Sequence, residues 1–133
     1  MEIRRGEIES ILSAGYKALE ESPIKDRLTM DLEAFIDSLK GYDILGLFDN
    51  DKPAGMFFYE GQYLHMAILP EYRGKWAHLF PELLQYGLDK YKKVLARIHK
   101  DNIYMQKLAV RAGFSYKTTE NEYLIYEMGE KLC

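Results

Sequence analysis

The sequence has little of what marks an extracellular, membrane-spanning or metal-dependent protein. Its one cysteine is Cys133, so no disulfide can form within the chain, and a reducing cytoplasm is the expected setting. Its three histidines show no metal-ligand spacing, so no metal site is expected. No apolar run is long enough to span a bilayer, and the charged start at residues 1–7 lacks the apolar core of a signal peptide.

An excess of positive charge is also missing. Eighteen Lys and Arg stand against 21 Asp and Glu, which gives a net charge of -3. A mildly acidic protein has no overall attraction for nucleic acid or an anionic membrane, so neither partner is expected. Any anion must therefore be held by a local site. With 133 residues and 47% hydrophobic content, the chain is expected to form one domain, residues 1–133, around a single core.

Hydrophobic periodicity predicts an α+β protein with the order β α α β β β α β α β β. In chain order we expect a short strand at 1–5, a helix from 7 to the Pro23 break, a helix at 32–39, strands at 42–48, 54–59 and 62–69, a long helix at 76–91, a strand at 94–98, a helix from about 102 to 112, and a hairpin of 114–117 and 123–128. Thr29 or Asp31 is expected to cap the second helix. Pro81 is expected to lie inside the long helix and to bend its early turns.

Residues 65–78 carry the clearest chemical signal. They predict a strand, a turn closed by Pro70, and an Arg73-Gly74-Lys75 run that enters a helix. The first N–H groups of a helix and the positive end of its dipole favour an anion such as a phosphate or pyrophosphate. On these residues alone, an ordinary strand-to-helix connection with two solvated cations is an equal alternative.

Two motifs in the right order resemble the GNAT superfamily of acyl-CoA-dependent N-acetyltransferases. The first is Ile68-Leu69-Pro70-Glu71-Tyr72-Arg73-Gly74-Lys75 with the helix after it, and the second runs from Asn102 to Gly113-Phe114. The resemblance covers nearly the whole chain. It implies a three-layer fold in which a central mixed, mostly antiparallel sheet splays at two parallel strands and carries helices on both faces. It also implies acetyl-CoA as co-substrate.

The resemblance carries particular residues into the cofactor site. The pantetheine arm would take hydrogen bonds from the strand backbone of Met66, Ala67 and Ile68. Asp101 or Asn102 is expected to cap the helix that follows, and Asn102 would hydrogen-bond the pantetheine or serve as the cap only. The pyrophosphate would rest on the loop and helix start, where the expected contacts are Arg73, Gly74, Lys75, Trp76, Ala77, His78 and Leu79.

Two of these positions, Trp76 and His78, depart from the family, which prefers small residues there. Trp76 belongs to the apolar stripe, so its indole is expected to point into the core. His78 lies off that stripe and would either donate to a phosphate or face water.

The catalytic groups of the family are only partly matched. Its usual tyrosine, which protonates the departing thiolate, falls at Ala109, so Tyr104 on another face of the same helix is the remaining candidate. Candidate general bases are Glu60, His65 and, through a water, Gln62.

Strand alternation separates these candidate bases. Gln62 and Leu64 would share the face commonly turned to the acceptor, and His65 would point the other way. A packed histidine is therefore the alternative role for His65, and His99 leaves the same choice open.

The implied reaction moves the acetyl group of acetyl-CoA to a primary amine by direct attack. The acceptor is a small molecule or a protein, and Glu20, Glu21 and Asp26 would favour a cationic amine. Compact acetyltransferases of phages and their hosts look similar. The alternative is a catalytically weak or inactive GNAT-fold module that binds CoA or another protein, and a homodimer through the C-terminal hairpin is left open.

Overall fold

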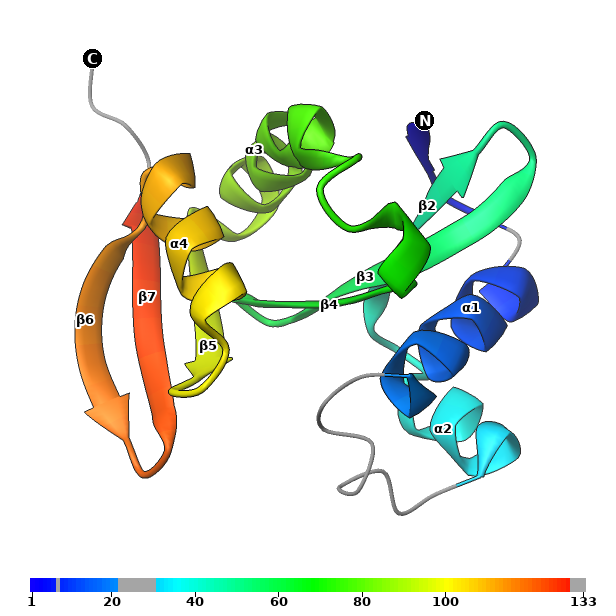
Figure 1. The fold of residues 1–133 in the computed structure, drawn as a ribbon, viewed down its shortest axis with the longest axis horizontal. Helices are drawn as coiled ribbons and strands as arrows, with labels where there is room; N and C mark the ends of the chain where they lie inside the picture. Colours follow the sequence, from blue (N-terminus) through cyan, green and yellow to red (C-terminus); the bar gives the residue numbers. More distant parts are fainter. Residues whose placement is uncertain (7, 22–30, 130–133) are drawn as a thin grey trace. The chain divides into compact units, whose positions relative to one another are not determined.

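The computed structural model describes residues 1–6, 8–21 and 31–129, and its elements follow the predicted order. They are β1 (Glu2–Arg4), α1 (Ile8–Glu20), α2 (Leu32–Ser38), β2 (Asp43–Asp49), β3 (Lys52–Glu60), β4 (Tyr63–Ile68), α3 (Phe80–Tyr91), β5 (Lys93–His99), α4 (Ile103–Ala112), β6 (Ser115–Glu120) and β7 (Tyr123–Gly129) (Figure 1). The strands are hydrogen-bonded in the order β1-β2-β3-β4-β5-β7-β6, with β4 and β5 parallel. The predicted mixed, mostly antiparallel sheet is confirmed, whereas the Pro23 break lies outside the described residues.

The chain divides into two compact units. The first contains Met1–Phe58 and Met66–Leu79, and the second contains Tyr59–His65 and Phe80–Cys133. Both β3 and β4 contribute residues to each unit. The last two residues of β3 and the first three of β4 belong to the second unit, and the rest of both strands belongs to the first.

In the first unit, α1 packs closely on β2 and β3. A Cβ at Gly46 would lie 2.5 Å from Cγ1 of Ile11, and a Cβ at Gly15 would lie 2.8 Å from Cε of Met56. Glycine at both positions therefore lets the helix approach the strands. The other face of β3 carries Phe57, which packs against Trp76 with 5.2 Å between ring centroids. Layers thus cover both faces of β3 within this unit.

In the second unit, α3 packs on Tyr59. The hydroxyl of this buried residue donates to the Leu83 carbonyl at 2.8 Å. A Cβ at Gly87 would lie 2.5 Å from Cζ of Tyr59, so only glycine leaves room for the ring. In the same unit, β5 pairs antiparallel with β7, and this register places Ala96 opposite Tyr126.

The helix ends follow local capping rules. Asp31 caps α2 by accepting from Ala34 N–H at 2.9 Å, so of the two predicted caps Asp31 is confirmed, and Thr29 lies outside the described residues. Asn102 caps α4 by accepting from Met105 N–H at 3.2 Å. Gly113 ends α4 with φ +105°, a left-handed conformation that glycine adopts without steric cost.

The prediction for the long helix was wrong at its start. A short 3-10 turn spans Ala77–Leu79, and α3 begins only at Phe80. Pro81 therefore occupies the first turn, where its missing N–H would have had no helical acceptor. The prediction that Pro81 lies inside the helix and bends its early turns was therefore wrong. None of the described helices is long and apolar enough to cross a membrane.

Candidate functional site

At the end of β4, the backbone N–H and C=O groups of successive residues point alternately toward β3 and away from it. Leu69 N–H donates to the Ala54 carbonyl at 3.0 Å, which directs the backbone of Leu69 toward β3. Residues alternate in an antiparallel ladder, so the N–H and C=O of Ala67 also point toward β3. Those of Met66 and Ile68 point away from it. Of the three residues expected to bind pantetheine, Met66 and Ile68 thus direct their backbone groups away from β3, and Ala67 directs its own toward it.

A contact that the sequence analysis did not identify fixes the position of this strand end. A Cβ at Gly55 of β3 would lie 2.7 Å from Cδ1 of Ile68 and 2.8 Å from the Ala67 carbonyl oxygen. Any larger residue would thus push against the backbone that carries Met66 and Ile68. A glycine inside a strand is the signal that could have indicated this close approach.

The loop that follows β4 uses several of its amides internally. Tyr72, Arg73, Lys75 and Leu79 donate to the carbonyls of Leu69, Pro70, Tyr72 and Trp76, at 2.8–3.2 Å. Gly74, Ala77 and His78 are not among these internal donors, and the first N–H groups of a helical turn have no acceptor within it. Of the predicted pyrophosphate contacts, Arg73, Lys75 and Leu79 therefore use their amides within the loop itself.

Gly74 shapes the same loop. Its φ of +78° lies in the left-handed region, and no atom lies within 4 Å of a Cβ built there. Arg73 and Lys75 on either side are exposed. The glycine thus serves backbone conformation, and it leaves two cations beside the turn.

The two departures from the family pattern differ in their surroundings. Trp76 is 2% exposed and packs on Phe57, so the prediction that its indole points into the core is confirmed. Its side chain therefore leaves the solvent side of the loop open. His78 is exposed, as both of its predicted roles require.

In the second unit, the start of α4 carries Asn102 as its cap and Tyr104 in its first turn. Asn102 uses Oδ1 in its cap, so both N–H donors of its amide remain for another partner. Tyr104 is 42% exposed, whereas Ala109 is 3% exposed and packs in the core. A tyrosine at 109 would point inward, so Tyr104 does not occupy an equivalent position.

Glu60 and His65 are brought together at the β3–β4 hairpin. His65 Nε2 lies 3.4 Å from Glu60 Oε1. Burial lowers the pKa of His65 below its ordinary value, the neighbouring Glu60 carboxylate partly raises it, and the charge of Arg97 lowers it again. A neutral imidazole held beside a carboxylate can accept a proton.

The other candidate base at this hairpin has structural contacts. The side-chain amide of Gln62 donates to the Tyr91 carbonyl at 3.0 Å, and the backbone carbonyl of Gln62 accepts from Leu95 N–H at 2.8 Å. Leu64 is buried, and His65 on the opposite face of β4 is half-buried. Gln62 thus joins the end of α3 to β5.

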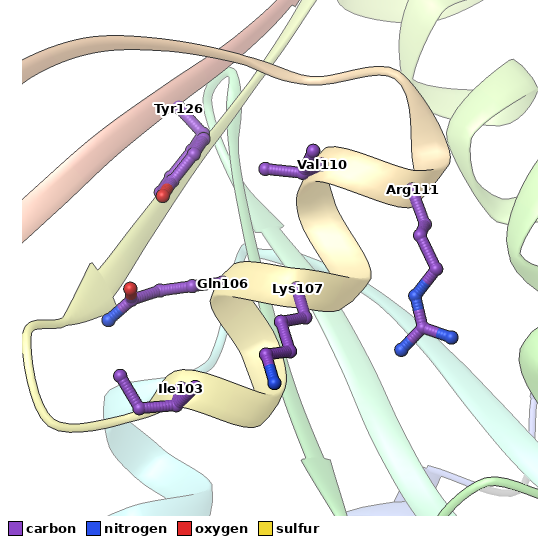
Figure 2. Close-up of a pocket in the computed structure, with 6 residues that line it drawn as sticks. All are labelled: Ile103, Gln106, Lys107, Val110, Arg111 and Tyr126. Carbon is purple, nitrogen blue, oxygen red and sulfur yellow. The ribbon is translucent and has the colours of Figure 1, made fainter.

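A hollow of about 430 Å³ lies elsewhere in the second unit (Figure 2). It is lined by Ile103, Gln106, Lys107, Val110, Arg111 and Tyr126. None of these residues was predicted as a site residue, so the hollow is a separate feature of the surface.

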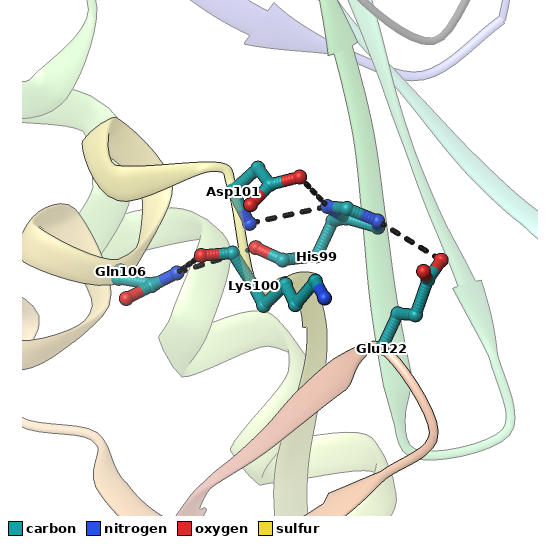
Figure 3. A network of polar contacts seen from close by, with 5 residues as sticks. All are labelled: His99, Lys100, Asp101, Gln106 and Glu122. Carbon is teal, nitrogen blue, oxygen red and sulfur yellow. Dashed lines mark hydrogen bonds and ion pairs between the residues drawn. The ribbon is translucent and has the colours of Figure 1, made fainter.

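His99 lies at the end of β5 in a network of polar contacts (Figure 3). Its Nδ1 accepts from Asp101 N–H at 3.1 Å, so in the neutral ring the proton is on Nε2, which lies 3.4 Å from Oε2 of Glu122. Gln106 donates to the carbonyls of His99 and Lys100 at 3.2 and 2.8 Å. Both ring nitrogens of His99 therefore hold the β5–α4 loop to the β6–β7 turn. Among residues 1–6, 8–21 and 31–129, no group of three or more His, Cys, Asp or Glu could hold a metal ion.

Comparison with known proteins gives a clear structural match. No protein-family model and no curated protein matches the sequence. Ribosomal-protein-alanine N-acetyltransferase from Brucella melitensis matches with a TM-score of 0.76 and 17% identity, over 98% of this chain and 100% of that one. PaiA N-acetyltransferase from Thermoplasma acidophilum, solved with coenzyme A, matches with a TM-score of 0.70 and 16% identity, over 97% of this chain and 98% of that one. N-acetyltransferase PseH from Campylobacter jejuni, solved with acetyl coenzyme A, matches with a TM-score of 0.72 and 13% identity, over 98% of this chain and 100% of that one.

These matches extend over whole chains at low identity, and they show the fold. The chain has the GNAT fold of N-acetyltransferases, as the two sequence motifs predict. Function has to be argued from the residues of the site.

Proposed function

We propose that this protein is an N-acetyltransferase that moves the acetyl group of acetyl-CoA to a primary amine. The observation that carries the proposal is the end of β4 in the first unit. There the outward backbone of Met66 and Ile68 leads into a basic turn built on left-handed Gly74. The same fold is found in acetyltransferases that were solved with CoA or acetyl-CoA.

In this proposal, Met66 and Ile68 bind the pantetheine arm as a neighbouring strand would. The amides of Ala77 and His78 donate to the pyrophosphate, and Arg73 and Lys75 add positive charge. The buried Trp76 does not obstruct that approach, because its side chain packs on Phe57. Separately, the amide of Asn102 is proposed as a donor to the pantetheine.

Acetyl-CoA supplies an activated thioester, whose carbonyl carbon is attacked by the amine as the C–N bond forms and the C–S bond breaks. The N–H of Ile68 is proposed to donate to the carbonyl oxygen, where negative charge develops. Because His65 lies on the opposite face of β4 from Leu64, it is proposed to take the proton released by the amine through a bridging water, while Glu60 orients the imidazole and stabilises its charged form. The departing thiolate needs no dedicated acid near neutral pH, which fits a buried alanine at position 109.

The acceptor is proposed to be a cationic amine of a small molecule or a protein. Glu20 and Glu21 lie at the end of α1 and supply negative charge there. The Brucella melitensis protein is named for acetylating an alanine of a ribosomal protein, so an N-terminal amine is one acceptor to test. We also propose that the chain acts as one cytoplasmic domain.

The proposal is tested in two steps. Acetyl-CoA at a hundredfold excess over its Kd should stabilise the fold by about 2.7 kcal/mol, seen as a higher Tm. Thiol release from acetyl-CoA should then rise when the right amine, from a panel of polyamines, aminoglycosides and peptides, is added. Binding without thiol release from any acceptor would favour the alternative, a CoA-binding module without turnover.

A further inference from the structure

The hollow on α4 has the composition of a protein-docking groove. We call it the α4 groove, and its lining residues are Ile103, Gln106, Lys107, Val110, Arg111 and Tyr126. Figure 2 shows Gln106 and Val110 directed toward Tyr126, while Lys107 and Arg111 extend from the helix beside them. The groove therefore has an apolar floor and a basic margin.

The apolar part of the groove is unusually exposed for its residue types. Ile103 is 52% exposed and Val110 is 59% exposed, one on each end of the groove. Tyr126 forms the floor, and Tyr116 of β6, 57% exposed, packs edge-on against it with 6.0 Å between ring centroids. Exposed apolar side chains thus surround the largely buried ring of Tyr126, an arrangement found at interaction surfaces.

The charges at the margin have no compensation within the described part of the chain. There, neither Lys107 nor Arg111 forms an ion pair, and α4 itself contains no acidic residue. The two cations stand four residues apart on one helix face, a spacing at which like charges repel and destabilise a helix. A partner that brings carboxylates would relieve this repulsion.

The scaffold under the groove is well held. Gln106 donates to two carbonyls of the β5–α4 loop, Asn102 caps the helix, and Gly113 ends it. A groove on such a pre-organised helix needs little ordering when a partner binds. This favours a short extended or helical segment that fits between α4 and the β6–β7 hairpin.

We propose that the α4 groove binds an acidic peptide segment of another protein. The segment would place an apolar side chain over Tyr126, between Ile103 and Val110, and its carboxylates beside Lys107 and Arg111. The charge of the groove selects this occupant, because a basic or neutral apolar segment would leave both cations desolvated without a partner. The proposal concerns a surface that the acetyl-transfer reaction does not use.

The probe is a fluorescein-labelled octapeptide with a central Leu-Phe pair and Glu at the other positions, titrated with the full-length protein in a polarisation assay. Saturable binding is expected, and the K107E/R111E double variant should raise Kd about tenfold or more. V110D should also weaken binding. K17E, which reverses an exposed cation in the last turn of α1, should leave Kd unchanged.

Two further peptides make the result specific. A version with Lys in place of Glu should not bind, and a version with Gly-Ser in place of Leu-Phe should bind at least about tenfold more weakly, as expected for an apolar anchor. Equal binding of all three peptides, no binding of the acidic peptide, or equal loss in K17E would overturn the proposal. So would a protein dimer that V110D dissociates and the acidic peptide does not displace, because a second copy would then cover the groove. Circular dichroism of each variant excludes unfolding as the cause.

Discussion

Nε2 of His65 lies 3.4 Å from Oε1 of Glu60, across the hairpin that joins β3 to β4. Burial disfavours the charged imidazole, and the carboxylate favours it, so the pair is tuned by two opposing effects. Because burial is the larger effect, the pKa of His65 is lowered and the ring is neutral at neutral pH. This is the state that a general base requires.

The pH profile of acetyl transfer tests this pair. Activity should fall at acid pH as His65 becomes protonated, because a protonated imidazole cannot accept the proton of the amine. E60Q removes the charge that favours imidazolium, so the acidic limb should move to lower pH. H65Q should lower kcat by about 10²–10⁴-fold, the usual contribution of a general base.

E122Q is the matched control, since Glu122 lies the same 3.4 Å from His99 Nε2. It should leave the acidic limb where it is in the wild type. An unmoved limb in both E60Q and H65Q would exclude His65 as the base.

G74A tests the anion loop. Alanine at φ +78° costs roughly 1–2 kcal/mol of backbone strain, which should lower stability and displace the amides that follow. The Kd for acetyl-CoA, measured by titration calorimetry, should rise.

G41A is the control for that strain. Gly41 has φ +90° and, like Gly74, no atom within 4 Å of an added Cβ. G41A should lose similar stability with no change in Kd. If both variants weaken binding equally, the loop has no special role.

Asn102 can be separated into its cap and its proposed ligand contact. Serine caps a helix about as well as asparagine, so N102S should keep its Tm while it loses the amide donors and binds acetyl-CoA more weakly. N102A should lose about 0.5–2 kcal/mol of stability as well. D31S, a cap replacement at α2, should leave binding unchanged. Unchanged binding in N102S would limit Asn102 to capping.

Gly55 tests the position of the strand end. G55A would bring a methyl group to 2.8 Å from the Ala67 carbonyl oxygen, so β4 must shift. We expect a loss of about 1–3 kcal/mol in a denaturant melt, as for overpacked cores, together with weaker acetyl-CoA binding.

G129A is its control at a strand end, where an added Cβ meets nothing within 4 Å. It should change neither quantity. A fully stable G55A variant with normal binding would show that the strand end tolerates the shift.

Much of this fold could be predicted from the sequence because local rules determine it. The periodicity predicts the element order. Cap chemistry limits each cap to two residues, Thr29 or Asp31 and Asp101 or Asn102, and the structure has Asp31 and Asn102. Trp76 was correctly placed in the core because its apolar character outweighs its position in a loop.

The remaining features depend on register and tertiary contact. The orientation of Met66 and Ile68, as opposed to Ala67, follows from the pairing of Leu69 with Ala54, which no local pattern specifies. The start of α3 was misplaced because Trp76 and Leu79 fit a helical period while forming a 3-10 turn. The contact of Glu60 with His65 requires the hairpin itself.

The most direct test of the central claim is calorimetric titration of the wild-type protein with acetyl-CoA, followed by thiol release with an amine panel. We predict saturable one-site binding that G74A weakens and G41A does not, and thiol release that depends on an amine. The absence of both heat and a Tm shift at millimolar acetyl-CoA would contradict the proposed function.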